Sequence, residues 1–304
     1  MNNPDLIITS DIHLRDTIPI CRTDDFWMAQ ERKIKHLCEV QKAYNDIPII
    51  DAGDLFHKWS SSPFLEAWAI NNLPENIFTV PGNHEMPSHN LNLMSKSSLA
   101  VMEAAGKLEI LQGKQKIKDN IVIGFPYGVD IAEHLFNNNA FELKESDINI
   151  ALIHIYVDKE GTPWFDDKAM GADELMSFLP QFNLIVTGHN HKNFIYRKGK
   201  QLIVNPGSMM RTNTTQINHK PAYYLWKADN NEIECCYYPF EENVISLEHI
   251  KREKEKKDRY NSFINRLNDN YDIELSFEKN LENYFKNNNV RSPVKDIINE
   301  SIIV

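Results

Sequence analysis

Short apolar runs recur along the first 240 residues, and each run has the length of a buried β-strand. They lie at residues 6–9, 47–51, 77–80, 121–125, 148–153, 184–187 and 202–205. Helical patterns lie between them, for example at 23–43, which begins with a Thr-Asp-Asp capping signal, and at 97–105. This alternation predicts an α/β core with helices on both sheet faces. Residues 222–228 and 232–240 then predict a strand pair joined by an Asp-Asn-Asn turn.

The last 61 residues have a different pattern. Residues 251–260 form a charge run that is typical of a solvated helix face. Three groups of apolar residues with the spacing of an amphipathic helix follow. They are Tyr260, Phe263, Ile264 and Leu267; Leu281, Tyr284 and Phe285; and Val294, Ile297 and Ile298. The third group comes after Ser292-Pro293, which is a helix-start signal. We predict two or three short helices, and we divide the chain into a core domain (1–243) and a helical C-terminal segment (244–304). These helices either pack on the core or bind a partner chain through their apolar faces.

The composition of the 304 residues, 42% hydrophobic and 25% charged, is that of an ordinary globular protein. No apolar run is long enough for a membrane span, and the start lacks the basic and apolar regions of a secretory signal. The four cysteines form no CxxC pair, which favours free thiols in a reducing compartment. We therefore expect a cytoplasmic protein, and the richness in Asn, Lys and Ile points to a bacterial or phage-infected cell.

The ends of the predicted strands carry an unusual set of polar side chains. Catalytic groups gather outside the carboxyl ends of the strands in open α/β sheets. Five motifs follow five strands in chain order: Asp11-Ile12-His13, GDLFH at 53–57, GNHE at 82–85, His154, and GHNH at 188–191. The glycines before Asp54, Asn83 and His189 suit tight turns or a close backbone approach. Each motif alone is common, so the evidence lies in their order and placement.

The spacing and the residue types indicate metal ligands. Residues i and i+2 of an extended chain point the same way, so Asp11 with His13, and His189 with His191, can each aim two ligands into one pocket. Imidazole and carboxylate together suit manganese, iron(II) or zinc. Seven candidate ligands exceed what one ion can bind, and they indicate two ions about 3.5–4 Å apart that share a carboxylate. Five histidines outside the motifs are interpreted as ordinary core or surface residues: His36, His89, His134, His219 and His249.

The series DxH, GD, GNHE, H and GHxH resembles that of the calcineurin-like metallophosphoesterase superfamily, over roughly residues 5–243. The resemblance implies a four-layer α/β sandwich of two mixed sheets flanked by helices. GDLFH, VNPGSMMR at 204–211, and PWFDDKAMGADEL at 163–175 are similar to the SbcD-type nucleases, which are subunits of a double-strand-break repair complex and include phage recombination nucleases.

The resemblance also implies roles for individual residues. One ion would be held by Asp11, His13, Asp54 and His191, and the second by Asn83, His154 and His189 together with the bridging Asp54. The ions, most simply manganese but also iron, zinc or magnesium, would lower the pKa of the water that attacks phosphorus. His84 would protonate the leaving oxygen or stabilise its charge, and Asn83 would also serve catalysis. His57 is a second candidate near the leaving group, and Glu85 would orient His84 or shape the loop.

The C-terminal segment departs from this resemblance, because such nucleases usually add a DNA-holding cap domain there. The segment better resembles the one that attaches to the coiled-coil base of an SMC-type ATPase of the SbcC kind. The helices near 63–71 and 91–105 correspond by position to dimer-forming helices of the family, so a homodimer is also open. Arg211 either contacts a phosphate or is a surface or salt-bridge arginine. Trp59 and Trp164 either stack on bases or pack within their loops.

Three functions stay open. The first is a metal-dependent DNA exo- or endonuclease that acts in recombination, repair or degradation with an ATPase partner. The second is a small-molecule phosphodiesterase or phosphatase, and the third is a metal-bound, non-catalytic scaffold that recruits a partner through its terminal helices. The net charge of −10 lies within the core, because residues 244–304 hold 11 basic and 11 acidic side chains. We therefore expect weak, metal-dependent binding of DNA by this chain alone.

Overall fold

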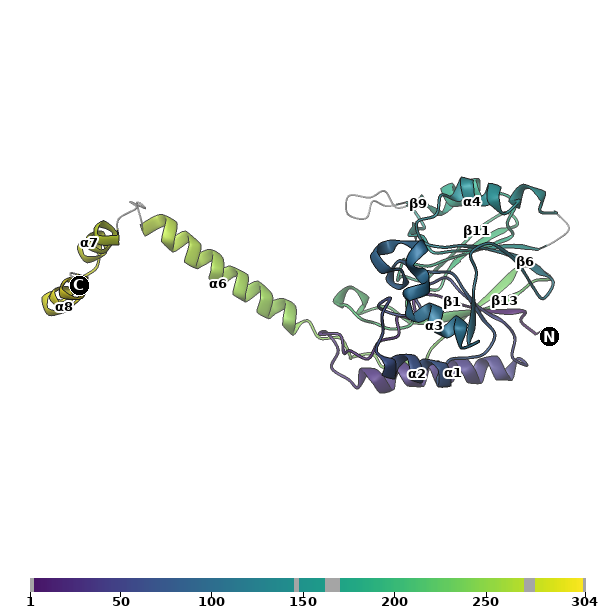
Figure 1. Cartoon of the computed structure of the whole chain (residues 1–304), viewed down its shortest axis with the longest axis horizontal. Helices are drawn as coiled ribbons and strands as arrows, with labels where there is room; N and C mark the ends of the chain where they lie inside the picture. Colours follow the sequence, from purple (N-terminus) through teal and green to yellow (C-terminus); the bar gives the residue numbers. More distant parts are fainter. Residues whose placement is uncertain (1–2, 145–147, 162–169, 271–276, 303–304) are drawn as a thin grey trace. The chain divides into compact units, whose positions relative to one another are not determined.

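The computed structural model describes residues 3–144, 148–161, 170–270 and 277–302 (Figure 1). The chain divides into two compact units, Met1–Ser246 and Leu247–Val304. In the described residues, no helix is both long and apolar enough to cross a membrane.

The first unit contains two six-stranded mixed sheets. One has the spatial order β14 (Glu232–Tyr237), β13 (Ala222–Lys227), β1 (Leu6–Thr9), β2 (Ile49–Asp51), β3 (Ile77–Thr79), β4 (Leu108–Ile110). The other has the order β11 (Phe194–Lys198), β12 (Gln201–Asn205), β10 (Leu184–Thr187), β7 (Asn149–Ile153), β6 (Asn120–Phe125), β5 (Lys114–Ile117). Four adjacent strands of each sheet are parallel, and the antiparallel pairings lie towards the edges. A short pair, β8 (Val157–Asp158) and β9 (Met170–Gly171), lies apart from both sheets.

Helices cover the outer face of each sheet, which confirms the predicted four-layer α/β sandwich. The first sheet is covered by α1 (Phe26–Ala43), α2 (Pro63–Asn72) and α3 (Ser98–Ala104), and the second by α4 (Ile131–Asn137) and α5 (Ala172–Phe178). In Figure 1, α1 and α2 lie along the lower face of the core and α4 along its upper face.

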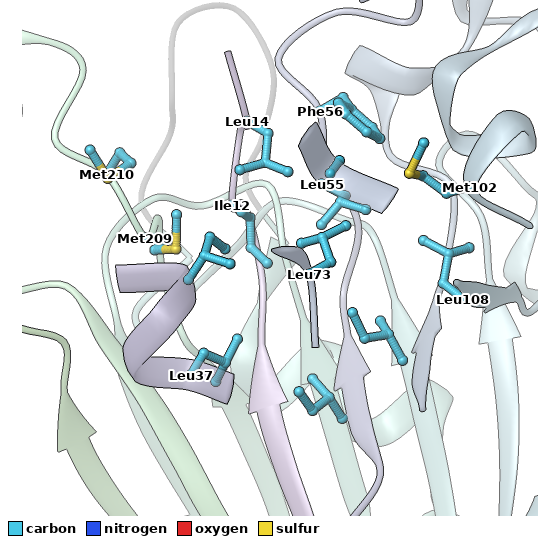
Figure 2. Packing of buried hydrophobic residues seen from close by; sticks show 14 of the residues in the cluster. Ile12, Leu14, Leu37, Leu55, Phe56, Leu73, Met102, Leu108, Met209 and Met210 are labelled. Carbon is cyan, nitrogen blue, oxygen red and sulfur yellow. The ribbon is translucent and has the colours of Figure 1, made fainter. Parts of the chain in front are cut away.

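Three apolar layers result from this arrangement. Ile7 and Ile8 are neighbours on β1, but Ile7 packs towards the helices while Ile8 packs between the two sheets. Successive strand side chains point to opposite faces, and a strand covered on both faces therefore reads as a continuous apolar run. Figure 2 shows part of the first layer, to which Leu37 of α1, Ile12, Leu55 and Phe56 all belong. The third layer lies between the second sheet and α4 and α5.

The helix starts follow local capping chemistry. Asp25, from the predicted Thr-Asp-Asp signal, accepts the main-chain N–H of Met28 and begins α1. The segment 91–105 is not one helix: a 3-10 helix, η3 (Leu91–Lys96), ends at Ser97, whose extended backbone and side-chain hydroxyl cap α3. A Ser in this conformation satisfies the free N–H groups of the second helix and so separates the two.

The second unit consists of α6 (Glu248–Asn270), α7 (Phe277–Asn287) and α8 (Ser292–Ile302). The predicted helical segment is thus confirmed, but α6 has 23 residues and is not short. The charge run 251–260 lies within α6 and is exposed throughout. This run makes the helix longer than predicted, because its solvated turns precede the apolar face at Tyr260 and Phe263. The side chain of Leu267 lies outside the described residues.

Candidate metal centre

The five predicted motifs come together at the carboxyl ends of β1, β2, β3, β7 and β10. One ligand atom each of Asp11, His13 and His191 lie within 4.8 Å of one another. Within this group, the Nε2 atoms of His13 and His191 are 3.1 Å apart, and Oδ1 of Asp11 is 3.5 Å from Nε2 of His191. These atoms therefore converge on one point, although His191 follows Asp11 by 180 residues in the chain.

A second group consists of Asp54, His154 and His189, whose ligand atoms also lie within 4.8 Å of one another. Asn83 adjoins it, because its Oδ1 atom is 3.1 Å from Nε2 of His154. Nδ1 of His154 is fixed by the main-chain carbonyl of Ala52 at 2.6 Å, which leaves Nε2 as the nitrogen directed into the group.

Asp54 lies between the two groups. Its Oδ2 atom is 3.7 Å from Nε2 of His13 in the first group and 3.4 Å from Nε2 of His154 in the second. This oxygen is buried and accepts no hydrogen bond from the described residues. A buried carboxylate oxygen without a donor is costly, whereas a divalent cation on each side would satisfy it. The residues therefore fit a pair of ions that share the Asp54 carboxylate.

Four of the candidate ligands have a strained backbone conformation. Asp11, His13, Asp54 and His189 have φ values of 50°, 51°, 58° and 71°, in the left-handed region that non-glycine residues rarely adopt. The chain at these positions is therefore not extended, so our expectation that residues i and i+2 of an extended chain point the same way does not hold here. Asp11 and His13 still point into the same group, because tight turns direct both side chains there. His189 and His191, in contrast, point into different groups. Such strain is typical of functional sites.

The glycines of the motifs allow the loops to approach closely. Gly53 has a φ of 93°, and a Cβ atom there would lie 2.6 Å from Nδ1 of His154. Added Cβ atoms at Gly82 and Gly188 would overlap Asp54 and the carbonyl of Ala52. Only glycine lets these loops pack against the candidate ligands.

The side chain of Glu85 is hydrogen-bonded to the main chain of the surrounding loops and makes no hydrogen bond with His84. Its Oε2 atom accepts the main-chain N–H groups of Asp54 at 3.2 Å and Gly82 at 2.9 Å, and Oε1 accepts that of Phe56 at 3.1 Å. Of the two roles that we considered for Glu85, the structure therefore supports the shaping of the loop. Burial, together with the nearby Asp54, raises the pKa of Glu85 to about 8.

His84 and His57 lie beside the first group. The His84 ring is 4.7 Å from that of His13 and 5.3 Å from that of His57, centre to centre. Nδ1 of His84 is 2.7 Å from the main-chain carbonyl of His57. Because a carbonyl can only accept, Nδ1 carries a hydrogen and Nε2 is left for another partner. Burial, followed by the charges of Arg15 and His84, lowers the pKa of His57 to about 4.

Asp54 and the histidines of the second group shift one another's pKa values. Burial alone raises the pKa of Asp54, but His154 and His13 bring it below its usual range. Burial lowers the pKa of His154, yet Asp54 raises it to about 9 overall. Burial and then His154 lower the pKa of His189 to about 4. The protein's own charges thus place a proton on His154 beside Asp54, and a divalent cation there would supply the positive charge instead.

Several residues that contact the candidate ligands or hold them in place were not predicted from the sequence. Ser10 donates to Oδ2 of Asp11 at 2.5 Å. The main-chain carbonyl of Asp11 accepts the N–H of Met209, and the carbonyl of Met209 accepts from Lys33 at 2.6 Å. Tyr127 lies 5.6 Å from His189, ring centre to ring centre. It follows β6 by two residues, so the rule that site residues gather at strand ends would have found it.

The remaining residues that the sequence suggested for substrate binding are Arg211, Trp59 and Trp164. Arg211 is buried, and its guanidinium donates to the main-chain carbonyls of Glu241, Glu242 and Ile217, so it is occupied within the fold. Trp59 is 42% exposed. Trp164 and most of the segment 163–175 lie outside the described residues.

Comparisons with known proteins agree with this geometry. A model of the calcineurin-like phosphoesterase family matches residues 5–193, which is more than half of the chain. A search of curated proteins found no significant match.

Two solved structures have the same fold. A candidate 5'-nucleotidase from Staphylococcus aureus, in complex with alpha-ketoglutarate, is 18% identical with a TM-score of 0.50, over 83% of this chain and 58% of that chain. The protein TT1561 of Thermus thermophilus is 11% identical with a TM-score of 0.52, over 78% of this chain and 99% of that one. An archaeal phosphodiesterase is 15% identical with a TM-score of 0.41, over 76% of this chain and 98% of that chain. The chain thus spans little more than half the length of the Staphylococcus aureus protein.

Proposed function

This chain belongs to the calcineurin-like phosphoesterase family, and we propose that it is a phosphodiester hydrolase with two divalent ions, most simply manganese, that cleaves DNA as the SbcD-type nucleases do. Family membership implies a hydrolase that uses divalent ions. The choice of DNA rests on the added His57 after GDLF and on the PGSMMR segment at 206–211.

One observation carries the proposed chemistry: the Oδ2 atom of Asp54 lies between two groups of imidazole and carboxylate ligands and accepts no hydrogen bond from the described residues. Asp11, His13 and His191 would hold one ion, and Asn83, His154 and His189 the other. When bound, two such ions activate water and neutralise charge on the phosphoryl oxygens. The donor set, with nitrogen and oxygen atoms and no thiolate, suits manganese, iron(II) or zinc.

The residues of the chain position the leaving group. His84 donates its main-chain N–H to Oδ1 of Asp54 at 2.9 Å, and its Nδ1 hydrogen to the His57 carbonyl, so that its ring is held beside the centre. We assign Nε2 of the protonated ring as the acid. As water attacks phosphorus in line, the bond to the leaving oxygen breaks and that oxygen takes the Nε2 proton. Solvent then returns a proton to His84.

The function is tested by incubating the pure protein and manganese with end-labelled single-stranded and duplex DNA, alongside bis(p-nitrophenyl) phosphate. We expect cleavage of both DNA and the small ester, and none of either by Asp54→Asn. Cleavage of the small ester alone would favour the second candidate, a small-molecule phosphodiesterase. Ion binding without hydrolysis of any ester would favour the non-catalytic scaffold.

Exposed apolar side chains in the second unit support a partner role for it. Phe277 is 67% exposed and Tyr284 46% exposed on α7, and Val294 is 45% exposed on α8. We propose that these helices bind the coiled-coil base of an SMC-type ATPase. Co-purification of the two chains, abolished by Phe277→Glu with Val294→Glu, would support this. A stable dimer of this chain that excludes the ATPase would contradict it.

A further inference from the structure

We propose that the hollow beside His84 holds the nucleoside on the leaving-group side of the scissile phosphate, with Trp59 stacking on its base and Lys58 contacting the next phosphate. This inference rests on the proposed function, because it names the substrate class that the same centre would cleave. It makes an unpaired nucleic-acid segment the substrate, rather than a phosphate ester with a small leaving group.

The hollow is continuous with the metal centre. It has a volume of 540 Å³, and Asn83 and His84 of the centre form part of its wall, which continues over His57, Lys58 and Trp59 to His89. A smaller hollow of 190 Å³ adjoins it, shares His57 and Lys58, and includes Arg15. A larger cavity of 660 Å³ between α1 and α2 includes none of the candidate ligands and is therefore not part of the site.

The charge of the two hollows suits an anionic substrate. The chain has a net charge of −10, yet none of the described residues that line the hollow at His84 carries a carboxylate. Lys58 is exposed and makes no hydrogen bond or ion pair with the described residues, so its ammonium group is available. In the adjoining hollow, Arg15 donates to the hydroxyl of Thr17, and the single carboxylate, Asp16, accepts from Ser62. Lysine and arginine side chains in adjoining hollows suit the phosphates of a nucleic-acid strand.

Trp59 is held as a platform. Its main-chain carbonyl accepts the N–H of Ser98 at 2.7 Å, and the side chain of Ser98 accepts the N–H of Ser61 at 2.7 Å. The loop after β2 is thus anchored to the start of α3 by its main chain, while the indole remains 42% exposed in the wall of the hollow. An exposed indole on an anchored loop offers a flat face on which a base can stack with little loss of conformational freedom.

The position of the hollow decides which part of the substrate it holds. The hollow begins at His84, which we assign as the donor to the leaving oxygen, so its occupant is the leaving group. A small alcohol would fill little of 540 Å³, whereas a nucleoside with its next phosphate could reach from His84 to Lys58. Stacking requires an open base face, which an unpaired strand provides.

The test compares two substrates in manganese: a thymidine pentanucleotide and bis(p-nitrophenyl) phosphate. Trp59→Ala should lower the ratio of kcat/KM for the pentanucleotide over that for the small ester at least fivefold, and Trp59→Phe should restore most of it. Lys58→Ala should lower the same ratio and reduce its salt dependence. Phe136→Ala and Lys116→Ala, exposed residues of α4 and β5, are the matched controls and should leave the ratio unchanged.

A second readout does not depend on turnover. Protein with manganese is titrated into a fluorescein-labelled thymidine pentanucleotide whose phosphorothioate linkages resist hydrolysis, and anisotropy should report binding that is at least fivefold weaker for Trp59→Ala than for the Phe136→Ala control. Equal binding and an equal kcat/KM ratio in folded Trp59→Ala would overturn the subsite and leave the phosphoesterase proposal intact. If the wild type cleaves neither substrate, the proposed function fails, whereas the binding measurement still decides the subsite.

Discussion

One carboxylate oxygen of Asp54 accepts the main-chain N–H of His84 at 2.9 Å, while the other lies between the two candidate metal groups. The candidate bridging ligand and the candidate acid are therefore fixed to each other. The ligand role of Asp54 depends on its side chain, whereas the link to His84 uses only a main-chain N–H of that residue. The two functions can consequently be separated by mutation.

Replacing Asp54 with Asn should remove the binding of both ions. The substitution removes the one negative charge that both groups share, and it places an amide where both ions need an anion. Isothermal titration with manganese should show at least a hundredfold weaker binding, and turnover should fall below detection. Asp130→Asn, which retains an N-cap residue for α4, is the matched control and should bind two ions. Unchanged stoichiometry in Asp54→Asn would contradict the bridging assignment.

Replacing His84 with Ala should leave two ions bound and should lower kcat by about 10²–10⁴-fold, the usual contribution of a general acid. The main-chain N–H that contacts Asp54 is retained in this variant. The measurements are titration with manganese and steady-state hydrolysis of bis(p-nitrophenyl) phosphate. A loss of ion binding would show that His84 is a ligand and refute the role given to it.

Replacing Glu85 with Gln should destabilise the protein by about 1–3 kcal/mol, because the amide group turns at least one acceptor of a buried main-chain N–H into a donor. The Asp54 loop would also lose its anchor, so ion affinity should fall. Urea unfolding and manganese titration measure the two effects. Glu39→Gln, at an exposed position of α1, is the control and should change neither. A Glu85→Gln protein of normal stability would mean that the three hydrogen bonds contribute little.

His219 should make stability depend on pH between about 6.5 and 4. Burial, only partly offset by the hydrogen bond from its Nε2 to the carbonyl of Ser208, lowers its pKa to about 4 in the folded protein. The unfolded chain therefore binds a proton in this window that the folded chain does not, and stability is lost as the pH falls. The loss attributable to His219 is about 2 kcal/mol at pH 5.

His57 and His189 have pKa values of about 4 as well, so they contribute in the same window. His219→Gln should reduce the difference in free energy of unfolding between pH 7 and pH 5, measured by urea titration in the presence of a chelator, without abolishing it. An unchanged difference would show that His219 is not buried as a neutral ring.

The sequence by itself determined the layers of the core and the identity of the candidate ligands. Apolar runs of strand length and capped helices such as the one begun by Asp25 are local patterns, and local patterns depend on neighbouring residues alone. The motifs at the strand ends were found in the same way, because parallel strands bring their carboxyl ends to one edge.

Tertiary structure alone decided how those ligands are distributed. His189 and His191 are two residues apart, yet one joins Asp54 and the other joins Asp11, because a left-handed turn at His189 replaces the extended chain. The occupation of Arg211 by main-chain carbonyls and the hollow at Trp59 likewise depend on segments that are distant in the chain. Contacts of this kind arise from the packing of sheets and loops, which no local period of the sequence encodes.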